Sequence, residues 1–361
     1  MDTLTIVLFV AGGVLLAVGA ESLVRGAARI AVSAGISPLV VGLTVVAFGT
    51  GAPELAVSFS SALSGDADIA VGNVVGSNIM NVFFILGVSA VVAPLVVAQQ
   101  LIRLDVPLMI GASVLLVAFA AGGTISTIEG GVLVLGIVVY TVWAIRKSRR
   151  ESREVAAEYD AEFEYGRSRG GVLFDVVLVI VGIGLLLLGS KWFVDGAIEF
   201  AELLGVSELV IGLTIVAAGT SMPEVATSVL ASLRGERDIA VGNVVGSNLF
   251  NILGVLGLTA LVADGGIAVA DAALRFDMPV MVAGAVLCLP IFIGGRINRW
   301  EGGLFLAYYL AYTVYLLLDA SGHDALVAYS TIMLGFVVPG TVITLAIVMV
   351  RTIRRGEAIP A

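Results

Sequence analysis

The sequence predicts an all-α polytopic membrane protein with two inverted five-helix repeats and an additional eleventh helix toward the C-terminus. Three observations predict this fold class: a very apolar composition, apolar stretches of membrane-spanning length, and a duplicated segment. Hydrophobic residues make up 59% of the 361 positions, charged residues make up 13%, and the mean hydropathy is +1.09. Soluble domains have roughly 45–50% apolar and about 25% charged residues. The chain therefore has the composition of a protein that is surrounded by lipid.

Apolar stretches long enough to cross a bilayer, which takes about 17 to 25 residues, occur eleven times. Five precede a charged segment, five follow it, and one more lies beyond them. The stretches lie at 4–20, 37–63, 69–94, 105–121, 130–145, 172–190, 207–233, 239–263, 276–294, 302–318 and 326–350. We therefore expect a first repeat at 1–145, a charged cytoplasmic loop at 146–171, a second repeat at 172–318, and an extra helix with a basic tail at 319–361.

The two halves share a duplicated segment. Residues 37–87 align without gaps on residues 207–257 at a constant offset of 170, with 30 of 51 positions identical. Five crossings separate one copy from the next, and five is odd, so the second copy is predicted to have the opposite orientation in the membrane.

The distribution of basic residues agrees with this inversion, because Lys and Arg concentrate in cytoplasmic loops. If the N-terminus is outside, 17 of the 19 basic residues fall on the cytoplasmic side. The exceptions are Lys191 and Arg275, and the duplicated loops differ in charge, with basic residues at 234–238 and none at 64–68. We expect a multi-pass protein of the cell (inner or plasma) membrane with the central loop and the C-terminus in the cytoplasm.

Each copy contains a helix interrupted by a polar run with glycine and proline, which ends in Pro53-Glu54 or Pro223-Glu224. Proline lacks an N–H donor and frees the carbonyl four residues earlier, so free carbonyls are predicted at 47–50 and 217–220. Such breaks survive in a bilayer where protein, water or an ion satisfies the carbonyls. An ion-binding site is therefore predicted at both breaks.

Glu54 and Glu224 are the candidate central ligands of this site. An ionisable group at the membrane midplane costs ~3 kcal/mol or more and usually lines a functional pathway. Ca²⁺ takes six to eight oxygen ligands from carboxylates, carbonyls and hydroxyls, and the two runs contain all of these. Two carboxylates would be neutralised by one Ca²⁺ or by two monovalent cations, so competition between these ions could couple their movements.

A helix with one polar face follows each break. The side chains at every fourth position lie on one face, and Gly72 and Gly76 form a GxxxG pair, which we expect to pack tightly against the broken helix. Such a stripe can also serve only to join helices; its occurrence in both copies, each beside a glutamate, favours a binding site. The supporting stripe comprises Asn73, Ser77 and Asn81 in the first copy and Asn243, Ser247 and Asn251 in the second.

These motifs resemble the alpha repeats of the sodium/calcium exchanger family, within the cation/calcium antiporter superfamily. That family has a GTSxPE-like run followed by a GSN-containing helix in each half, as at 49–54 with 76–78 and at 219–224 with 246–248. The resemblance implies a ten-helix core in which the second, third, seventh and eighth helices surround the ions. It also implies that the first and sixth helices slide to give alternating access.

The resemblance further implies a set of ligands in each half. Ca²⁺ would be held by the two central carboxylates with two threonine carbonyls, and Na⁺ would occupy flanking positions. The implied Ca²⁺ ligands are Glu54, Glu224, Thr50 and Thr220; the implied Na⁺ ligands are Ala217, Thr220, Ser221, Glu224 and Ser247 at one position and Ala47, Glu54 and Ser77 at the other, with Asn81 and Asn251 in the middle.

Two positions depart from the family pattern. Gly51 stands where the family commonly has Ser, which removes a hydroxyl from one flanking Na⁺ site and could alter the stoichiometry or favour protons. Asn251 stands where many relatives carry Asp, which argues against dependence on K⁺.

Secondary active exchange of Ca²⁺ for Na⁺ is the expected function, with a Ca²⁺/H⁺ antiporter or a passive cation channel as alternatives. A net charge of −9 argues against nucleic acid as a partner. The sequence has no Walker A loop for ATP and no HExxH or serine-histidine arrangement, so neither ATP use nor an enzyme is expected. No cofactor is expected, membrane lipid and inorganic cations are the expected partners, and the oligomeric state stays open.

Overall fold

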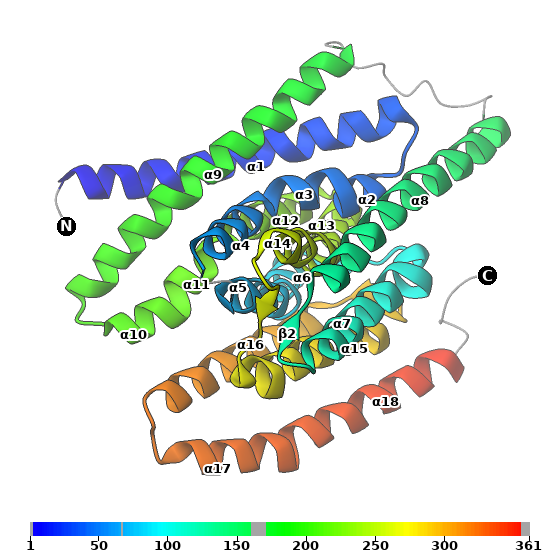
Figure 1. The fold of residues 1–361 in the computed structure, drawn as a ribbon. Coiled ribbons are helices and arrows are strands. Elements are labelled where there is room, and N and C mark those ends of the chain that lie inside the picture. The colour runs from blue at the N-terminus through cyan, green and yellow to red at the C-terminus, as the bar shows by residue number, and fades with distance from the viewer. Residues whose placement is uncertain (1–2, 66–67, 160–170, 355–361) are drawn as a thin grey trace.

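The computed structural model describes residues 3–65, 68–159 and 171–354, most of them helical (Figure 1). In the first half the elements are α1 (Thr3–Ala34), α2 (Pro38–Val41), η1 (Gly42–Val46), α3 (Ala47–Thr50), α4 (Ala52–Ser64), α5 (Asp68–Met80), η2 (Asn81–Ile85), α6 (Leu86–Val92), β1 (Leu95–Val96), η3 (Leu101–Asp105), α7 (Val106–Ala120), β2 (Thr124–Ile125) and α8 (Thr127–Tyr159). In the remainder they are α9 (Gly171–Leu203), α10 (Glu208–Ile211), η4 (Gly212–Val216), α11 (Ala217–Gly219), α12 (Met222–Arg234), α13 (Arg237–Leu249), η5 (Phe250–Leu256), α14 (Gly257–Val262), β3 (Ile267–Ala268), η6 (Ala273–Asp277), α15 (Met278–Phe292), β4 (Arg296–Ile297), α16 (Arg299–Ala320), α17 (Ala325–Ile332), η7 (Met333–Val337) and α18 (Val338–Arg354).

The number of crossings agrees with a polytopic membrane fold. Within the described residues, nine helices are long and apolar enough to span a bilayer, and the bent pair Pro38–Thr50 and Ala52–Ser64 adds a tenth. The axes of that pair differ by 46° at the break. The stretch expected at 207–233 forms the corresponding broken helix, from α10 to α12. The predicted all-α membrane fold is therefore confirmed.

Helices α1 and α9 are much longer than predicted, with 32 and 33 residues. The apolar stretches at 4–20 and 172–190 cover only the first part of each helix, because hydropathy marks the part of a helix in hydrocarbon and the helix continues beyond the first charges. At 1.5 Å per residue each helix is about 48 Å long, against a hydrocarbon core of about 30 Å. The two helices cross along one edge of the molecule (Figure 1).

Glycines spaced seven residues apart bring α1 and α9 into close contact. A Cβ atom at Gly19 would lie 2.9 Å from the carbonyl oxygen of Gly182, and one at Gly12 would lie 2.9 Å from that of Gly189. The order of these pairs shows that the helices run antiparallel. Any larger side chain at these positions would separate the helices.

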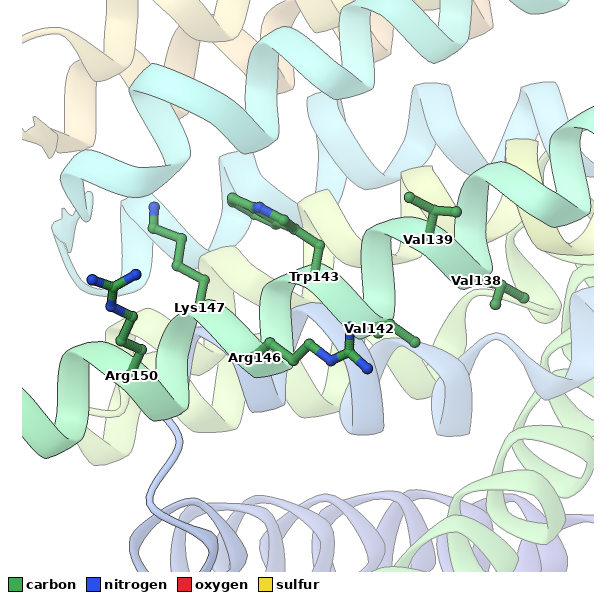
Figure 2. Close-up of a pocket in the computed structure, with 7 residues that line it drawn as sticks. All are labelled: Val138, Val139, Val142, Trp143, Arg146, Lys147 and Arg150. Atoms are coloured by element: carbon green, nitrogen blue, oxygen red, sulfur yellow. The ribbon is translucent and has the colours of Figure 1, made fainter.

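The segment predicted as a charged loop at 146–171 is helical in its first part, because α8 continues to Tyr159; residues 160–170 lie outside the described part of the chain. The ammonium nitrogen of Lys147 lies over the side chain of Trp143, 5.2 Å from the centroid of the indole ring. Aromatic and basic residues gather at membrane interfaces, so the bilayer boundary is expected here. A groove of about 590 Å³ follows this face of α8 (Figure 2) and is lined by Val138, Val139, Val142, Trp143, Arg146, Lys147 and Arg150.

Two small sheets connect the halves, which the sequence did not predict. Strand β1 pairs with β4, with Leu95 opposite Ile297, and β2 pairs with β3, with Thr124 opposite Ala268. Both pairs are antiparallel, and each joins a strand of one half to a strand of the other. The connections between crossings are therefore held together by the opposite half.

Three of the π-helical segments have a common cause in proline. Pro107, Pro279 and Pro339 each follow the last residue of η3, η6 or η7 by two positions. Each proline lacks the N–H that would bond to the carbonyl four residues earlier, and local widening of the helix accommodates this loss. The helix expected at 326–350 accordingly runs from α17 through η7 to α18, along the edge of the molecule opposite α1 and α9 (Figure 1).

Candidate functional site

The two glutamates predicted as central ligands lie together at the centre of the fold. Glu54 is in the first turn of α4 and Glu224 is in the first turn of α12, where the helix dipole favours negative charge. Each residue is 1% exposed, and the carboxylates are close enough to interact electrostatically. Within the described residues, neither carboxylate forms an ion pair with a basic side chain. Two buried negative charges without a cationic partner are costly, so this centre is suited to a bound cation.

Proline shapes the break before each glutamate. Pro53 and Pro223 stand in the first turn of α4 and α12, and Pro223 lacks the N–H that would reach the carbonyl of Gly219. The hydroxyl of Ser190 on α9 donates to that carbonyl instead, at 2.8 Å. Ala20 holds the equivalent position on α1, so the first half has no such hydroxyl. Ser190 lies outside the duplicated segment, so the repeat gave no signal for it.

The asparagines that begin each polar stripe support the adjacent broken helix. Asn73 Nδ2 donates to the backbone oxygen of Glu54 at 3.1 Å and to Ser58 Oγ at 3.0 Å. Asn243 Nδ2 donates to Ser228 Oγ at 2.9 Å. The two serines were overlooked in the sequence, although each lies one helical turn after its glutamate and is identical in both copies.

Two threonines connect the halves of the site. Thr50 Oγ1 donates to Asn243 Oδ1 at 3.2 Å, and Thr220 Oγ1 lies 3.5 Å from Asn73 Oδ1. Each threonine therefore reaches the asparagine of the other half, so the breaks in α2–α4 and α10–α12 face the opposite repeat.

Ser221 also contacts the opposite half. Its hydroxyl donates to Glu54 Oε1 at 3.0 Å and lies 3.2 Å from Ser77 Oγ, which is 3.4 Å from the same carboxylate oxygen. The resemblance grouped Ser221 with Glu224 and Ser247, whereas its hydrogen bonds here are with Glu54 and Ser77. The Glu54 carboxylate consequently lies beside the hydroxyl groups of Ser221 and Ser77.

Four asparagine side chains pair where the ends of α5 and α13 and the starts of η2 and η5 meet. Asn81 Nδ2 donates to Asn248 Oδ1 at 3.0 Å, and Asn251 Nδ2 donates to Asn78 Oδ1 at 3.1 Å. Asn78 and Asn248 were not among the predicted site residues because they lie off the four-residue stripe. The sequence did contain a signal for them, because both copies have asparagine at this position, 170 residues apart.

Several buried oxygen atoms of these helices have no hydrogen-bond partner among the described residues. They are Glu54 Oε2, Glu224 Oε2, Ser247 Oγ, Asn81 Oδ1 and Asn251 Oδ1. Buried polar atoms are nearly always satisfied, and carboxylate, hydroxyl and amide oxygens are the ligands that hard cations prefer. The chemistry of this set therefore fits an oxygen-liganded cation.

The two halves differ in how closely their helices pack. A Cβ atom at Gly246 on α13 would lie 2.5 Å from the carbonyl oxygen of Leu43, and one at Gly242 would lie 2.8 Å from that of Leu39. At Gly72 and Gly76, the equivalent positions on α5, an added Cβ would meet no atom within 4 Å. The prediction that Gly72 and Gly76 pack tightly was therefore wrong for this arrangement. Of the two pairs of glycines, only Gly242 and Gly246 on α13 lie against the backbone of the opposite half.

The same difference appears in the exposure of the breaks. Ala47 and Thr50 are 0% and 1% exposed, whereas Ala217 is exposed and Thr220 is half-buried. Asn73 on the facing helix is also half-buried. The break in α10–α11 is therefore less covered, on the side that faces α5, than the break in α2–α3 is on the side that faces α13.

Comparison with known proteins identifies the family. The family described as sodium/calcium exchanger protein matches residues 4–146 and 174–318, which include both halves and all the predicted site residues. The chain belongs to the sodium/calcium exchanger family. The matched residues end before α17, so the last membrane helix lies outside the region that defines the family.

Relatives of this exchanger align over nearly their full length. The putative antiporter CaxA of Alkalimonas amylolytica is 38% identical over 315 residues, which cover 86% of this chain and 97% of CaxA. The sodium/calcium exchanger MaX1 of Methanosarcina acetivorans is 35% identical over 350 residues, covering 88% and 99%. A structure of the sodium-calcium exchanger NCX_Mj, soaked with Na⁺ and Sr²⁺, superposes with a TM-score of 0.74 at 32% identity, covering 87% of this chain and 99% of that one. The exchanger is thus a multi-pass membrane transporter of a family that exchanges cations.

Proposed function

We propose that this exchanger moves Ca²⁺ in one direction and Na⁺ in the other, with both ions bound between Glu54 and Glu224. The observation that carries the proposal is the pair of buried carboxylates, which have no basic partner among the described residues. A charge of −2 in this setting is balanced equally by one Ca²⁺ or by two monovalent cations. The two kinds of ion would therefore compete for one site, and competition couples their transport.

The ligand sets implied by the resemblance form part of this proposal. Ca²⁺ would lie between the two carboxylates and the carbonyl groups of Thr50 and Thr220, which end α3 and follow α11. The resemblance implies a Na⁺ position beside each carboxylate, and which of the two is used is taken up below. The Na⁺ ligands that it implies are Ala47, Glu54 and Ser77 at one position and Ala217, Thr220, Ser221, Glu224 and Ser247 at the other.

Alternating access would arise from the unequal packing of the two halves. The open side lies against the first half of α5, which follows the 64–68 loop that the charge distribution places outside. We propose that this arrangement is open to the outside, and that closing α10–α11 onto α5 while α2–α3 leaves α13 gives the inward-open form. The N-terminus would then be outside, and the central segment and C-terminus would lie in the cytoplasm of a cell expressing the protein in its inner or plasma membrane.

A pair of equivalent cysteine variants tests this access. Ala217→Cys is expected to react with a membrane-impermeant thiol reagent added to the outside of cells, because Ala217 is exposed beside the opening. Ala47→Cys is the matched control and is expected to react at least tenfold more slowly, because Ala47 is fully buried. The native Cys288 is also buried and contributes little background. Faster labelling of Ala47→Cys from the outside would contradict the proposed orientation.

Ion flux in proteoliposomes tests the function directly. An outward or inward Na⁺ gradient is expected to drive radiolabelled Ca²⁺ in the opposite direction, and dissipating a proton gradient is expected to leave that flux unchanged. Ca²⁺ movement driven by protons and not by Na⁺ would replace this proposal with a Ca²⁺/H⁺ antiporter, which the missing hydroxyl at Gly51 keeps as the alternative. Ca²⁺ conductance without any counter-ion, far above carrier rates, would establish a passive channel instead.

A further inference from the structure

The two ligand-bearing breaks differ by one hydroxyl group. Ser221 in the second copy corresponds to Gly51 in the first, at the repeat offset of 170. Ser221 contributes a hydroxyl that donates to Glu54 Oε1 at 3.0 Å and lies 3.2 Å from Ser77 Oγ. The equivalent hydroxyl in the first copy would face Glu224 and Ser247, but Gly51 has no side chain. The Glu54 side of the site therefore has two serine hydroxyl groups, those of Ser77 and Ser221, and the Glu224 side has only the equivalent of the first, Ser247.

An aromatic ring occupies the space beside Gly51. A Cβ atom there would lie 2.9 Å from Phe250 Cδ1 and 3.1 Å from Phe250 Cε1. The same ring approaches Gly254, where a Cβ atom would lie 2.7 Å from Phe250 Cδ2. Phe48 stacks on it with a centroid distance of 4.5 Å and an interplanar angle of 29°. The Phe250 ring is thus held between two glycines and a second ring, so it has little room to move away.

The residues around this ring differ from their repeat equivalents as a group. Phe250 corresponds to Met80, Phe48 to Ala218, and Gly254 to Phe84. The equivalent place beside Ser221 therefore lacks both the wedged ring and the glycine that admits it, and the hydroxyl of Ser221 stands there instead. Because four positions differ together, the aromatic wedge is built into one side of the site and does not result from the loss of a single serine.

A Na⁺ ion needs oxygen ligands to replace its hydration shell, and an apolar ring supplies none. Ser247 Oγ has no hydrogen-bond partner among the described residues, whereas its repeat equivalent Ser77 lies 3.2 Å from the hydroxyl of Ser221, so no serine completes the Glu224 side as Ser221 completes the Glu54 side. We propose that the exchanger has one hydroxyl-lined Na⁺ position, beside Glu54 and Ser221, and that Phe250 closes the equivalent position beside Glu224. This inference rests on the proposed Na⁺/Ca²⁺ exchange and determines how many Na⁺ ions it uses.

The test is to give the Na⁺ position beside Glu224 the same residues as the position beside Glu54. The double variant Gly51→Ser/Phe250→Met places a hydroxyl at position 51 and gives position 250 the residue found at its repeat equivalent. Bound Na⁺ is counted by equilibrium dialysis of purified protein against radiolabelled Na⁺ at saturation. The double variant is expected to bind one more Na⁺ per molecule than the unmodified protein, and the Hill coefficient for Na⁺-driven Ca²⁺ flux is expected to rise.

Two controls separate the hydroxyl from the ring. Phe250→Met alone opens space without adding an oxygen ligand, and it is expected to leave the Na⁺ count unchanged. Ser221→Gly reproduces the first-copy residue in the second copy, and it is expected to remove one Na⁺. Melting temperature and Ca²⁺ binding of each variant show that it is folded.

An unchanged Na⁺ count in a folded double variant that still binds Ca²⁺ would overturn the inference, as would an unchanged count in Ser221→Gly. These results differ from a failure of the proposed function. If the unmodified protein moved no Ca²⁺ but the Na⁺ counts changed as stated, exchange would be wrong and the assignment of Na⁺ positions would stand.

Discussion

Replacing Glu54 or Glu224 by glutamine is expected to reduce Ca²⁺ transport by about 100-fold or more. Each replacement keeps the size of the side chain but removes one of the two negative charges that the buried centre offers to a divalent ion. Loss of one partner of a buried charge interaction amounts to roughly 3 kcal/mol, which corresponds to about two orders of magnitude in affinity. Flux of radiolabelled Ca²⁺ into proteoliposomes and Ca²⁺ binding by the purified variants measure the effect.

Asp195→Asn provides the control for this experiment, because it also removes one negative charge from a membrane helix. Its carboxylate is exposed and pairs only with Lys191 among the described residues, at 3.1 Å, and exposed pairs contribute about 0–1 kcal/mol. Transport by this variant is expected to remain within a factor of two. Unimpaired transport by either glutamine variant would exclude that carboxylate as a ligand and remove the basis of the proposed site.

Valine at Gly76 is expected to stop transport without unfolding the protein, whereas valine at Gly246 is expected to destabilise it. Gly76 faces open space in this arrangement, so the added side chain meets no atom. Closing α10–α11 onto α5 would bring that side chain against backbone, as Leu43 already lies against Gly246. The Gly76 variant is therefore expected to bind Ca²⁺ from the outside while its turnover falls by about 100-fold, because the closed form is overpacked by roughly 3 kcal/mol.

Thermal unfolding in detergent and flux measured in parallel distinguish these outcomes. Gly246→Val is expected to lower the melting temperature by several degrees, since overpacking against backbone costs ~3 kcal/mol or more. Gly111→Val is the control for placing valine in a membrane helix, because Gly111 is exposed and no atom lies within 4 Å of an added Cβ. Normal turnover by Gly76→Val would show that α10–α11 never closes onto α5, and the proposed alternation would then be wrong.

The duplicated segment was sufficient to predict the architecture. An offset of 170 residues, separated by an odd number of crossings, requires two antiparallel copies, and this places the two glutamates opposite each other. The proline before each glutamate indicated a broken helix, and both breaks are present. Asn78 and Asn248 are identical in the two copies, and this identity could have indicated their paired amides. They were missed because the polar face was chosen by four-residue spacing within one copy.

The features that the sequence did not reveal depend on contacts between the copies. Gly76 and Gly246 are the same residue in the same motif, and which of them is packed depends on the conformation of the whole molecule rather than on local sequence. The effect of Gly51 could be anticipated as a lost hydroxyl, but the ring of Phe250 beside it comes from a helix about 200 positions away. The true ends of α1 and α9 were hidden because a helix that extends beyond the bilayer no longer has a hydropathy signal there.

The paired strands have a consequence for the origin of the fold. In the described part of the chain each sheet takes one strand from each half, because β1 pairs with β4 and β2 pairs with β3. A half-length ancestor would have lacked these pairings as a single chain, and could have completed them only with a second molecule inserted upside down. Molecules of this ancestor would therefore have had to insert into the membrane in both orientations. Fusion of two gene copies would later have given each half one fixed orientation.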